Sequence, residues 1–473
     1  MCHRKNFAGG FCRRLRSAGI ISENDFEVSR QFRPADAISK PYKEEADMAV
    51  FRPFTAVRPN EHIADKVAAL PYDVMNSAEA REMVKDDPYS FLHVDKAEVD
   101  LDPSIDIYDA SVYAKAAENL QKMLDNGVNI RDDKPAYFIY RQIMNGRAQA
   151  GIVGCASIDD YQNNIIKKHE LTRADKEEDR VRHVDTCNAN TGPIFLTFRD
   201  NGFIGKFTAD WMTSNDPIYD FVAEDGISHT VWKIDDAATI AELEKYFNTV
   251  PAFYIADGHH RSASAVRVGL KRRAEHPNYD GTEEFNFFLS VLFPSDVLHI
   301  FDYNRVVHDL NGLTEEEFFA KVGEAFDIAP MADMPADKAA DAEFLEKYRP
   351  AKKHDVSMYI AGRWYRLTAK AGTFDESDPV SRLDVSILQK NLLTPVLSIG
   401  DPRTDSRISF IGGIRGLKEL VKLVDGGRAV AFAMYPTTLD DLMDIADAGA
   451  IMPPKSTWFE PKLRSGLFVH YLD

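Results

Sequence analysis

The chain has 473 residues, of which 44% are hydrophobic and 11% aromatic, so it can build large cores and is not an intrinsically disordered protein. Its 57 basic and 75 acidic side chains give a net charge of −18, which argues against binding to nucleic acid or anionic membranes and favours small-molecule ligands. No apolar run approaches the roughly 20 residues of a membrane span, and the four cysteines form no CxxC pair, so we expect a cytoplasmic protein without a disulfide framework.

Residues 1–47 differ from the rest of the chain. They carry nine basic and seven acidic side chains, a net charge of +2, which leaves −20 for the remainder. They are rich in Arg, Gly and Ser and show no apolar period. We expect this extension to be disordered, either as an Arg-rich transit peptide or as an over-extended start that precedes Met48.

Strand-like and helical segments alternate from Met48 onward. A first strand is expected within residues 48–54. Asn145-Gly146 and Ala361-Gly362 predict hairpin turns, and Thr314 with Glu317 forms a capping box at the start of a helix. The remaining expectations are helices at 103–126, 237–247, 260–275, 380–393 and 417–424, and strands at 193–198, 253–256, 285–293, 427–434 and 466–471. The fold class is therefore α+β (mixed α/β).

The segment Asp257-Gly258-His259-His260-Arg261 lies between an expected strand and an expected helix. Gly258 permits a tight turn, and the start of the helix leaves free N–H groups and a positive dipole end. Together with two imidazoles and a guanidinium, this arrangement is typical of a phosphate site. Asp257 offers a carboxylate for Mg²⁺.

Other interpretations of this segment stay open. A capped helix with solvent-exposed histidines would have the same sequence. A zinc site on both histidines is disfavoured, because adjacent residues of a helix point about 100° apart.

A second charged segment runs from Lys168 to Arg182. Lys176 and Arg180 are four residues apart and share a helix face. Glu170 precedes this helix among basic residues, and a carboxylate beside an anion site can act as a general base towards an alcohol. A solvated charged helix is the alternative interpretation. With the bases of 259–261, these residues predict a positively charged pocket in an otherwise acidic protein.

A third polar segment, Pro454-Lys455-Ser456-Thr457, places a lysine and two hydroxyls in a stiff loop that could contact a phosphate, although an ordinary surface turn would look the same. The chain contains no Walker-type loop, nucleophile elbow or dinucleotide fingerprint.

From about Met48 to the C-terminus, the chain resembles the family catalogued as domain of unknown function 1015 (DUF1015). Several long motifs carry the resemblance in the same order: 66–74 (KVAALPYDV), 88–92 (PYSFL), 168–172 (KHELT), 254–261 (YIADGHHR), 383–388 (LDVSIL) and 452–457 (MPPKST).

The central part also resembles the ParB/sulfiredoxin-like fold, in particular the free L-serine kinases built on it. The matching residues are His169-Glu170, Pro193-Ile194 and Asp257 to Arg261. The resemblance implies a ParB/sulfiredoxin-like core with additional α+β parts at both ends. The expected division is a disordered or mis-started extension (1–47), an N-terminal part (48–160), the catalytic core (161–300) and a C-terminal part (301–473).

The same resemblance implies that the protein phosphorylates free L-serine to O-phosphoserine with ATP (or ADP) and Mg²⁺. Glu170 then becomes the base on the serine hydroxyl, and Asp257 the metal ligand. The implied phosphate and nucleotide contacts are Gly258, His259, His260, Arg261 and Lys455; the residues implied to bind substrate or offset charge are Lys168, His169, Thr172, Lys176 and Arg180.

Two other function classes stay open. One is a nucleotide hydrolase or a kinase of another small alcohol, and the other is a non-catalytic nucleotide-binding sensor. Sulfiredoxin chemistry needs a cysteine where this chain has His259 or His260. ParB proteins need a DNA-binding helical domain that is not recognisable here, and the acidic charge argues against nucleic-acid partners.

Overall fold

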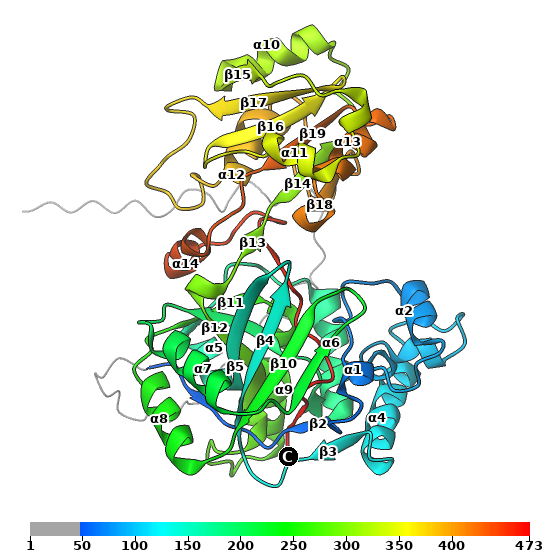
Figure 1. Ribbon diagram of the computed structural model, residues 1–473, viewed down its shortest axis with the longest axis vertical. Helices are drawn as coiled ribbons and strands as arrows, with labels where there is room; N and C mark the ends of the chain where they lie inside the picture. Colours follow the sequence, from blue (N-terminus) through cyan, green and yellow to red (C-terminus); the bar gives the residue numbers. More distant parts are fainter. Residues whose placement is uncertain (1–47) are drawn as a thin grey trace, which may run out of the picture. The chain divides into compact units, whose positions relative to one another are not determined.

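Two large β-sheets, of nine and six strands, organise residues 48–473, the part of the chain that the computed structural model describes (Figure 1). The expectation of a disordered or mis-started extension at 1–47 lies outside the described residues. The mixed α/β class predicted from the sequence is confirmed.

The nine-stranded sheet has the order β6-β11-β8-β12-β5-β4-β10-β9, with β1 paired to β5. It mixes antiparallel pairs such as β4–β5 with parallel pairs such as β8–β12 and β6–β11. Its strands are β1 (Phe51–Arg52), β4 (Tyr137–Met144), β5 (Arg147–Ser157), β6 (Ile166–Lys167), β8 (Ile194–Phe198), β9 (Tyr219–Val222), β10 (Ser228–Ile234), β11 (Phe253–Asp257) and β12 (Phe287–Pro294).

Successive side chains of β4 point to opposite faces of this sheet, and each face has its own hydrophobic cluster. Tyr137 and Ile139 pack with one cluster, which includes residues of the helices α7 (Phe203–Ser214), α8 (Ala237–Phe247) and α9 (His259–Glu275). Phe138 and Tyr140 belong to the opposite cluster, which includes Phe468 from the end of the chain. A third cluster includes residues of α1 (Ala64–Val67), α2 (Ser77–Val84), α3 (Leu92–Asp95), α4 (Ala110–Asp125) and α6 (Ala174–Cys187). Ile158 of α5 (Ile158–Gln162) packs instead with the cluster of α7, α8 and α9.

The six-stranded sheet is antiparallel throughout, in the order β15-β17-β16-β19-β14-β18. Its strands are β14 (Tyr303–Val307), β15 (Phe326–Pro330), β16 (Asp355–Ile360), β17 (Arg363–Ala369), β18 (Ile408–Gly412) and β19 (Val430–Met434). Its helices are α10 (Glu315–Ala325), α11 (Ala342–Leu345), α12 (Asp384–Leu388), α13 (Leu417–Asp425) and α14 (Leu439–Asp447).

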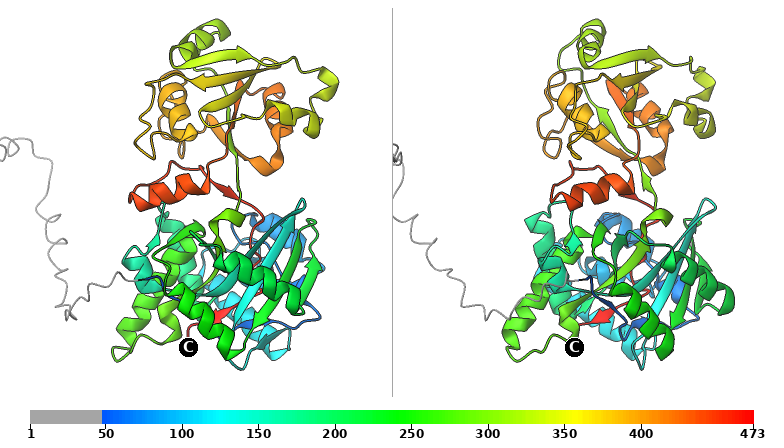
Figure 2. Two further views of the ribbon diagram at one scale, coloured as in Figure 1. Left: turned by 60° about the vertical axis from the view of Figure 1, so that its left-hand side comes forward. Right: turned by 90° about the vertical axis from the view of Figure 1, so that its left-hand side faces the viewer.

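Helix α14 contacts the nine-stranded sheet and the segment that precedes α12, and Figure 2 shows it lying between the two large sheets. Asp447 accepts a hydrogen bond from Tyr254 of β11, and Asp444 pairs with Arg382 of the C-terminal part. These contacts tie α14 to β11 on one side and to the C-terminal part on the other.

Segments distant in the sequence also meet in three short two-stranded sheets. They pair β2 (Val57–Pro59) with β3 (Asn129–Arg131), β13 (Ile300–Phe301) with β20 (Trp458–Phe459), and β7 (Ala189–Asn190) with β21 (His470–Tyr471). The boundary predicted after residue 160 falls inside the nine-stranded sheet, because β5 and β12 pair across it. The boundary predicted after residue 300 falls within β13.

Most predicted turns and helix ends are confirmed. Asn145 and Gly146 have φ of 52° and 77°, as a two-residue hairpin turn requires, and Ala361 and Gly362 have 49° and 77°. The capping box at Thr314 is formed.

Three predicted elements are considerably longer than the observed ones. The helix expected at 103–126 starts only at Ala110, because Asp109 caps it by accepting from the Ser111 N–H. The helix expected at 380–393 is α12 followed by a π-helical turn at Gln389–Leu393. The last strand is limited to His470–Tyr471.

None of the helices within residues 48–473 combines the length and hydrophobicity that a bilayer span requires.

Candidate functional site

The site is built at the junction of β11 and α9. Strand β11 ends at Asp257, and Gly258 turns the chain with a φ of 97° into His259, the first residue of α9. A Cβ at Gly258 would lie 3.2 Å from Nε of Arg261, so this position requires glycine for both its backbone conformation and its neighbour. The predicted strand, turn and helix start are therefore all present.

Asp257 is held by two contacts. One carboxylate oxygen accepts the Gly258 N–H at 3.0 Å, and the other accepts from the Lys462 ammonium at 3.0 Å. Burial alone would raise the pKa of Asp257, but the charges of Lys462 and Arg261 outweigh it and hold this pKa well below its usual value. The Mg²⁺ site predicted at Asp257 stays a prediction. A cation bound there would compete with the Lys462 ammonium for the Asp257 carboxylate.

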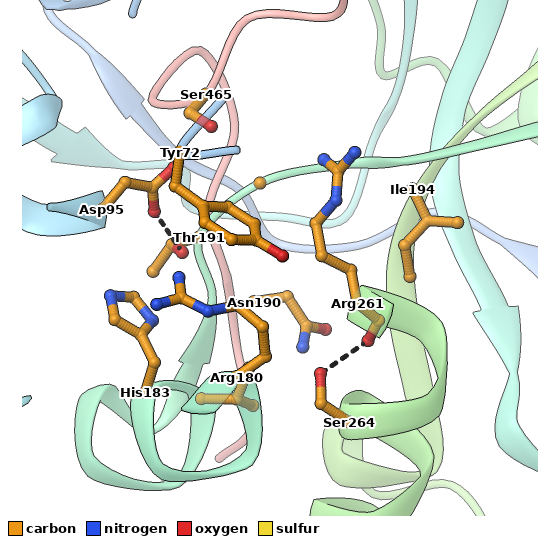
Figure 3. A pocket seen from close by; sticks show the side chains of 12 residues that line it. Tyr72, Asp95, Arg180, His183, Asn190, Thr191, Ile194, Arg261, Ser264 and Ser465 are labelled. Atoms are coloured by element: carbon orange, nitrogen blue, oxygen red, sulfur yellow. Dashed lines mark hydrogen bonds between the residues drawn. The ribbon is translucent and has the colours of Figure 1, made fainter. Parts of the chain in front are cut away.

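Arg261 points back beneath the turn. Its guanidinium donates to the Pro193 carbonyl at 2.6 Å and lines a small cavity of about 20 Å³, room for one water (Figure 3). In the same cavity the Arg180 guanidinium lies 4.0 Å from the centre of the Tyr72 ring. The two arginines are thus held in place on opposite sides of Tyr72.

The first turn of α9 lines a cavity of about 840 Å³, a size typical of ligand pockets. A second cavity, of about 950 Å³, lies beside it and is lined by residues of α6 and by the loop around Pro402. Six residues line both cavities: Tyr72, Asp73, Glu170, His260, Met452 and Lys455. We call these six the junction.

Glu170 is the central acidic group of the junction. Its side chain is 53% exposed, and a carboxylate oxygen lies 3.9 Å from Nδ1 of His259. Partial burial and the charge of Asp257 raise the pKa of Glu170, whereas Lys455 and Lys462 lower it. Within residues 48–473 the carboxylate has no Lys or Arg partner, so it can accept a proton from a ligand.

His169 and His259 form a buried pair behind Glu170. Their rings are 4.5 Å apart and nearly perpendicular. Burial lowers the pKa of His169 to about 4, and burial together with His169 lowers that of His259 as well, so both imidazoles are neutral at neutral pH. His260 points elsewhere, and its Nε2 accepts the Arg173 N–H at 3.0 Å.

The predicted residues of the charged segment separate into two groups. Thr172, Lys176 and Arg180 line the second cavity. Thr172 donates to Glu177, Lys176 donates to the Tyr108 hydroxyl, and Arg180 pairs with Asp179. Lys168 lines neither cavity, because its ammonium lies over the Tyr161 ring at 4.0 Å.

The expectation of a positively charged pocket is only partly met. The first cavity, at the start of α9, is lined by acidic as well as basic side chains, and two of the acids, Asp225 and Asp257, are neutralised by ion pairs with Arg464 and Lys462. Three of its cations, by contrast, pair with no carboxylate among the described residues: Arg261, Arg415 and Lys455. Positive charge is therefore available to an anionic ligand at these three residues.

Two contributors were not among the predicted site residues. Asp73 lies in the family segment 66–74 and lines both cavities, so that motif was a usable signal. Lys462 lies in no recognisable pattern and reaches the site only through the return of the C-terminal segment to β11.

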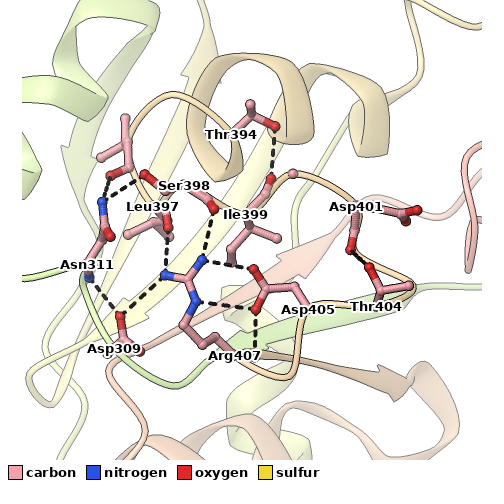
Figure 4. A network of polar contacts seen from close by, with 12 residues as sticks. Asp309, Asn311, Thr394, Leu397, Ser398, Ile399, Asp401, Thr404, Asp405 and Arg407 are labelled. Carbon is pink, nitrogen blue, oxygen red and sulfur yellow. Dashed lines mark hydrogen bonds and ion pairs between the residues drawn. The ribbon is translucent and has the colours of Figure 1, made fainter. Parts of the chain in front are cut away.

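A loop from the C-terminal part borders the second cavity through Pro402, Arg403 and Asp405. Figure 4 shows how Arg407 holds this loop: its guanidinium donates to the carbonyls of Leu397 and Ser398 and pairs with Asp405 at 2.8 Å. The loop therefore has a defined position at the cavity.

The fold and site define a mixed α/β protein with a two-part cavity built around the start of a helix. A family model described as a protein of unknown function (DUF1015) matches residues 51–386, and the chain therefore belongs to this family. No curated protein matches the chain significantly.

Three solved structures illustrate what the chain is similar to. A mutant free serine kinase in complex with AMP is 14% identical, with a TM-score of 0.31, and the match covers 69% of this chain and 92% of that one. A conserved hypothetical protein from Pyrococcus furiosus is 12% identical (TM-score 0.30; 66% and 92% covered). SbnI with a C-terminal truncation from Staphylococcus aureus is 9% identical (TM-score 0.34; 66% and 85% covered). TM-scores this low do not establish a common function or a common site.

Proposed function

We propose that the protein is a kinase that transfers a phosphoryl group from ATP (or ADP) to the hydroxyl of free L-serine, with Mg²⁺ as the accompanying cation. One observation carries the proposal: the carboxylate of Glu170 stands where two ligand-sized cavities meet, beside the start of α9. A transfer reaction needs two substrates whose reacting atoms meet next to a base, and this geometry provides for both.

The first cavity, at the start of α9, suits the nucleotide. The N–H groups of the first turn of α9 and the unpaired cations Arg261, Arg415 and Lys455 are the groups that bind phosphates. Tyr303 and Trp458 add aromatic surface on which the purine ring of the nucleotide can stack.

The second cavity suits the acceptor. It carries both basic and acidic groups, among them Lys176 and Asp73, which is the charge pattern that a zwitterionic amino acid needs. The choice of serine rests on the motif resemblance, since His169-Glu170 and Asp257 to Arg261 match the free L-serine kinases residue by residue.

In the proposed step, Glu170 accepts the proton of the serine hydroxyl. The hydroxyl oxygen forms a new bond to the transferred phosphorus as the bond from phosphorus to the leaving phosphate oxygen breaks. The raised pKa of Glu170 brings the carboxylate closer to the basicity that this proton transfer needs.

The test is an assay of the purified full chain with ATP or ADP, Mg²⁺ and each of the common amino acids in turn, with products identified by mass spectrometry. We expect O-phosphoserine from L-serine only. Free phosphate without phosphoserine would instead identify a nucleotide hydrolase. A different phosphorylated alcohol would identify another kinase, and nucleotide binding without turnover would identify a sensor. Each of these outcomes overturns the proposal.

A further inference from the structure

Three side chains at one edge of the nine-stranded sheet converge in a way that the proposed function does not explain. His169 and Glu170 follow β6, and His259 follows β11. Because β6 and β11 pair in parallel, these residues emerge at the same edge. One ligand atom from each of the three residues, a ring nitrogen or a carboxylate oxygen, lies within 4.8 Å of the other two.

The two histidines are buried without the contacts that buried imidazoles normally make. His169 is 2% and His259 5% exposed. Among residues 48–473, neither ring nitrogen of His169 has a hydrogen-bond partner of normal geometry, and neither does Nε2 of His259. Leaving such a polar atom unpaired in a buried position is unfavourable, so several of them at one point indicate a ligand that satisfies them.

Burial lowers the pKa of His169, and the Ile255 carbonyl beside the ring opposes this effect. A histidine that binds a metal through one nitrogen commonly directs the other to a backbone carbonyl, which orients the ring. The surroundings of His169 therefore suit a ligand role better than a purely structural one.

We propose that His169, Glu170 and His259 bind a Zn²⁺-type divalent cation. Two neutral imidazoles and one carboxylate form a donor set that zinc takes with a fourth position open, and here Glu170 lines both cavities. Magnesium prefers a shell of oxygen atoms, so this site differs in kind from the Mg²⁺ of the proposed kinase.

The cation and the proposed base share Glu170. A carboxylate that coordinates zinc is not free to accept the hydroxyl proton, so occupancy of this site excludes phosphoryl transfer by the route proposed above. This consequence rests on the proposed function, whereas the metal site itself rests only on the three side chains.

The experiment uses the untagged full chain, stripped of metal, with Co²⁺ as the spectroscopic probe for zinc. We expect one equivalent of Co²⁺ to produce visible d–d absorption of a low-coordinate complex, without the near-ultraviolet band that thiolate ligation by a cysteine would give. Zn²⁺ added afterwards should abolish the signal. Absence of such a complex, or a thiolate band, overturns the proposal.

Variants assign the ligands. Glu170→Gln changes a half-exposed side chain and should fold normally; we expect it to weaken Co²⁺ binding about 10-fold or more. His259→Gln should weaken it about 100-fold or more, with circular dichroism checking the fold. His260→Gln, one residue away but outside the trio, is the matched control and should bind Co²⁺ as the wild type does. Unchanged affinity in Glu170→Gln overturns the proposal even if His259→Gln does not fold.

The metal and kinase proposals fail separately, because the titration contains neither nucleotide nor serine. A chain that binds Co²⁺ but forms no phosphoserine contradicts the proposed function alone. A chain that forms phosphoserine but binds no Co²⁺ contradicts the metal site alone.

Discussion

The Lys462 ammonium lies 3.0 Å from the carboxylate of Asp257, across 205 residues of sequence. The contact joins the C-terminal segment to the end of β11, where the candidate site begins. The Lys462 side chain is only 15% exposed, so its charge is largely shielded from water. Asp257 in turn raises the pKa of Lys462 against the effect of burial. The last part of the chain therefore completes the site rather than merely covering it.

Lys462→Met tests this ion pair. The substitution leaves the Asp257 carboxylate without its cationic partner, and we expect the free energy of unfolding to fall by about 3 kcal/mol. Urea unfolding at pH 7 measures the change. Lys462→Arg, which keeps the charge, should retain most of the stability; a Met variant as stable as the wild type would show that the pair contributes nothing.

Glu170→Gln tests the proposed base. The amide cannot accept the hydroxyl proton, so we expect turnover to fall by about 100-fold or more, while nucleotide affinity stays within a few-fold of the wild type because the phosphate contacts lie on α9 and Lys455. Phosphoserine formation and titration calorimetry provide the two measurements. Normal turnover in this variant would remove Glu170 from the mechanism.

Gly258→Ala tests the turn before α9. The backbone there has a φ of 97°, and the new Cβ would lie 3.2 Å from Nε of Arg261. We expect a stability loss of about 1–2 kcal/mol and a fall in nucleotide affinity of about 10-fold as the guanidinium shifts.

Gly281→Ala is the matched control for this glycine. Gly281 has a φ of 99°, but a Cβ there would meet nothing within 4 Å. The control should lose similar stability and bind nucleotide normally. Equal loss of affinity in both variants would mean that backbone strain, not the position of Arg261, is responsible.

Asp384 predicts a pH dependence of stability. Burial, with smaller contributions from Asp441 and Asp355, raises the pKa of this carboxyl to about 7, although it accepts the His354 N–H at 2.8 Å. A folded-state pKa above the unfolded value means that the stabilising contribution is complete below about pH 4 and is lost as pH rises towards 7. The slope can reach about 1.4 kcal/mol per pH unit.

Asp384→Asn should remove this slope, because the amide does not titrate but still accepts from His354. Urea unfolding of both proteins at pH 5 and pH 7 provides the comparison. We expect the wild type to lose more stability than the variant between the two values; parallel losses would show that Asp384 titrates normally.

Local signals in the sequence were enough to predict much of the secondary structure. Asn145-Gly146 turns the chain because both residues accept a positive φ. Thr314 and Glu317 start a helix because the side chain of each accepts the backbone N–H of the other. The strand, glycine turn and helix from β11 to α9 follow the same rule. In each case the interactions that decide the structure lie within a few residues.

The candidate site likewise combines features set by the local sequence with features set by distant contacts. The sequence by itself determined the family, the helix start at Gly258 and the presence of Glu170 and His259 as reactive groups. Only the tertiary structure decided that Glu170 stands between two cavities, that Lys168 turns away to Tyr161, and that Lys462 neutralises Asp257. Local hydrogen bonds select turns and helix ends, whereas contacts between distant segments depend on strand pairing and burial across the whole fold, which no short motif encodes.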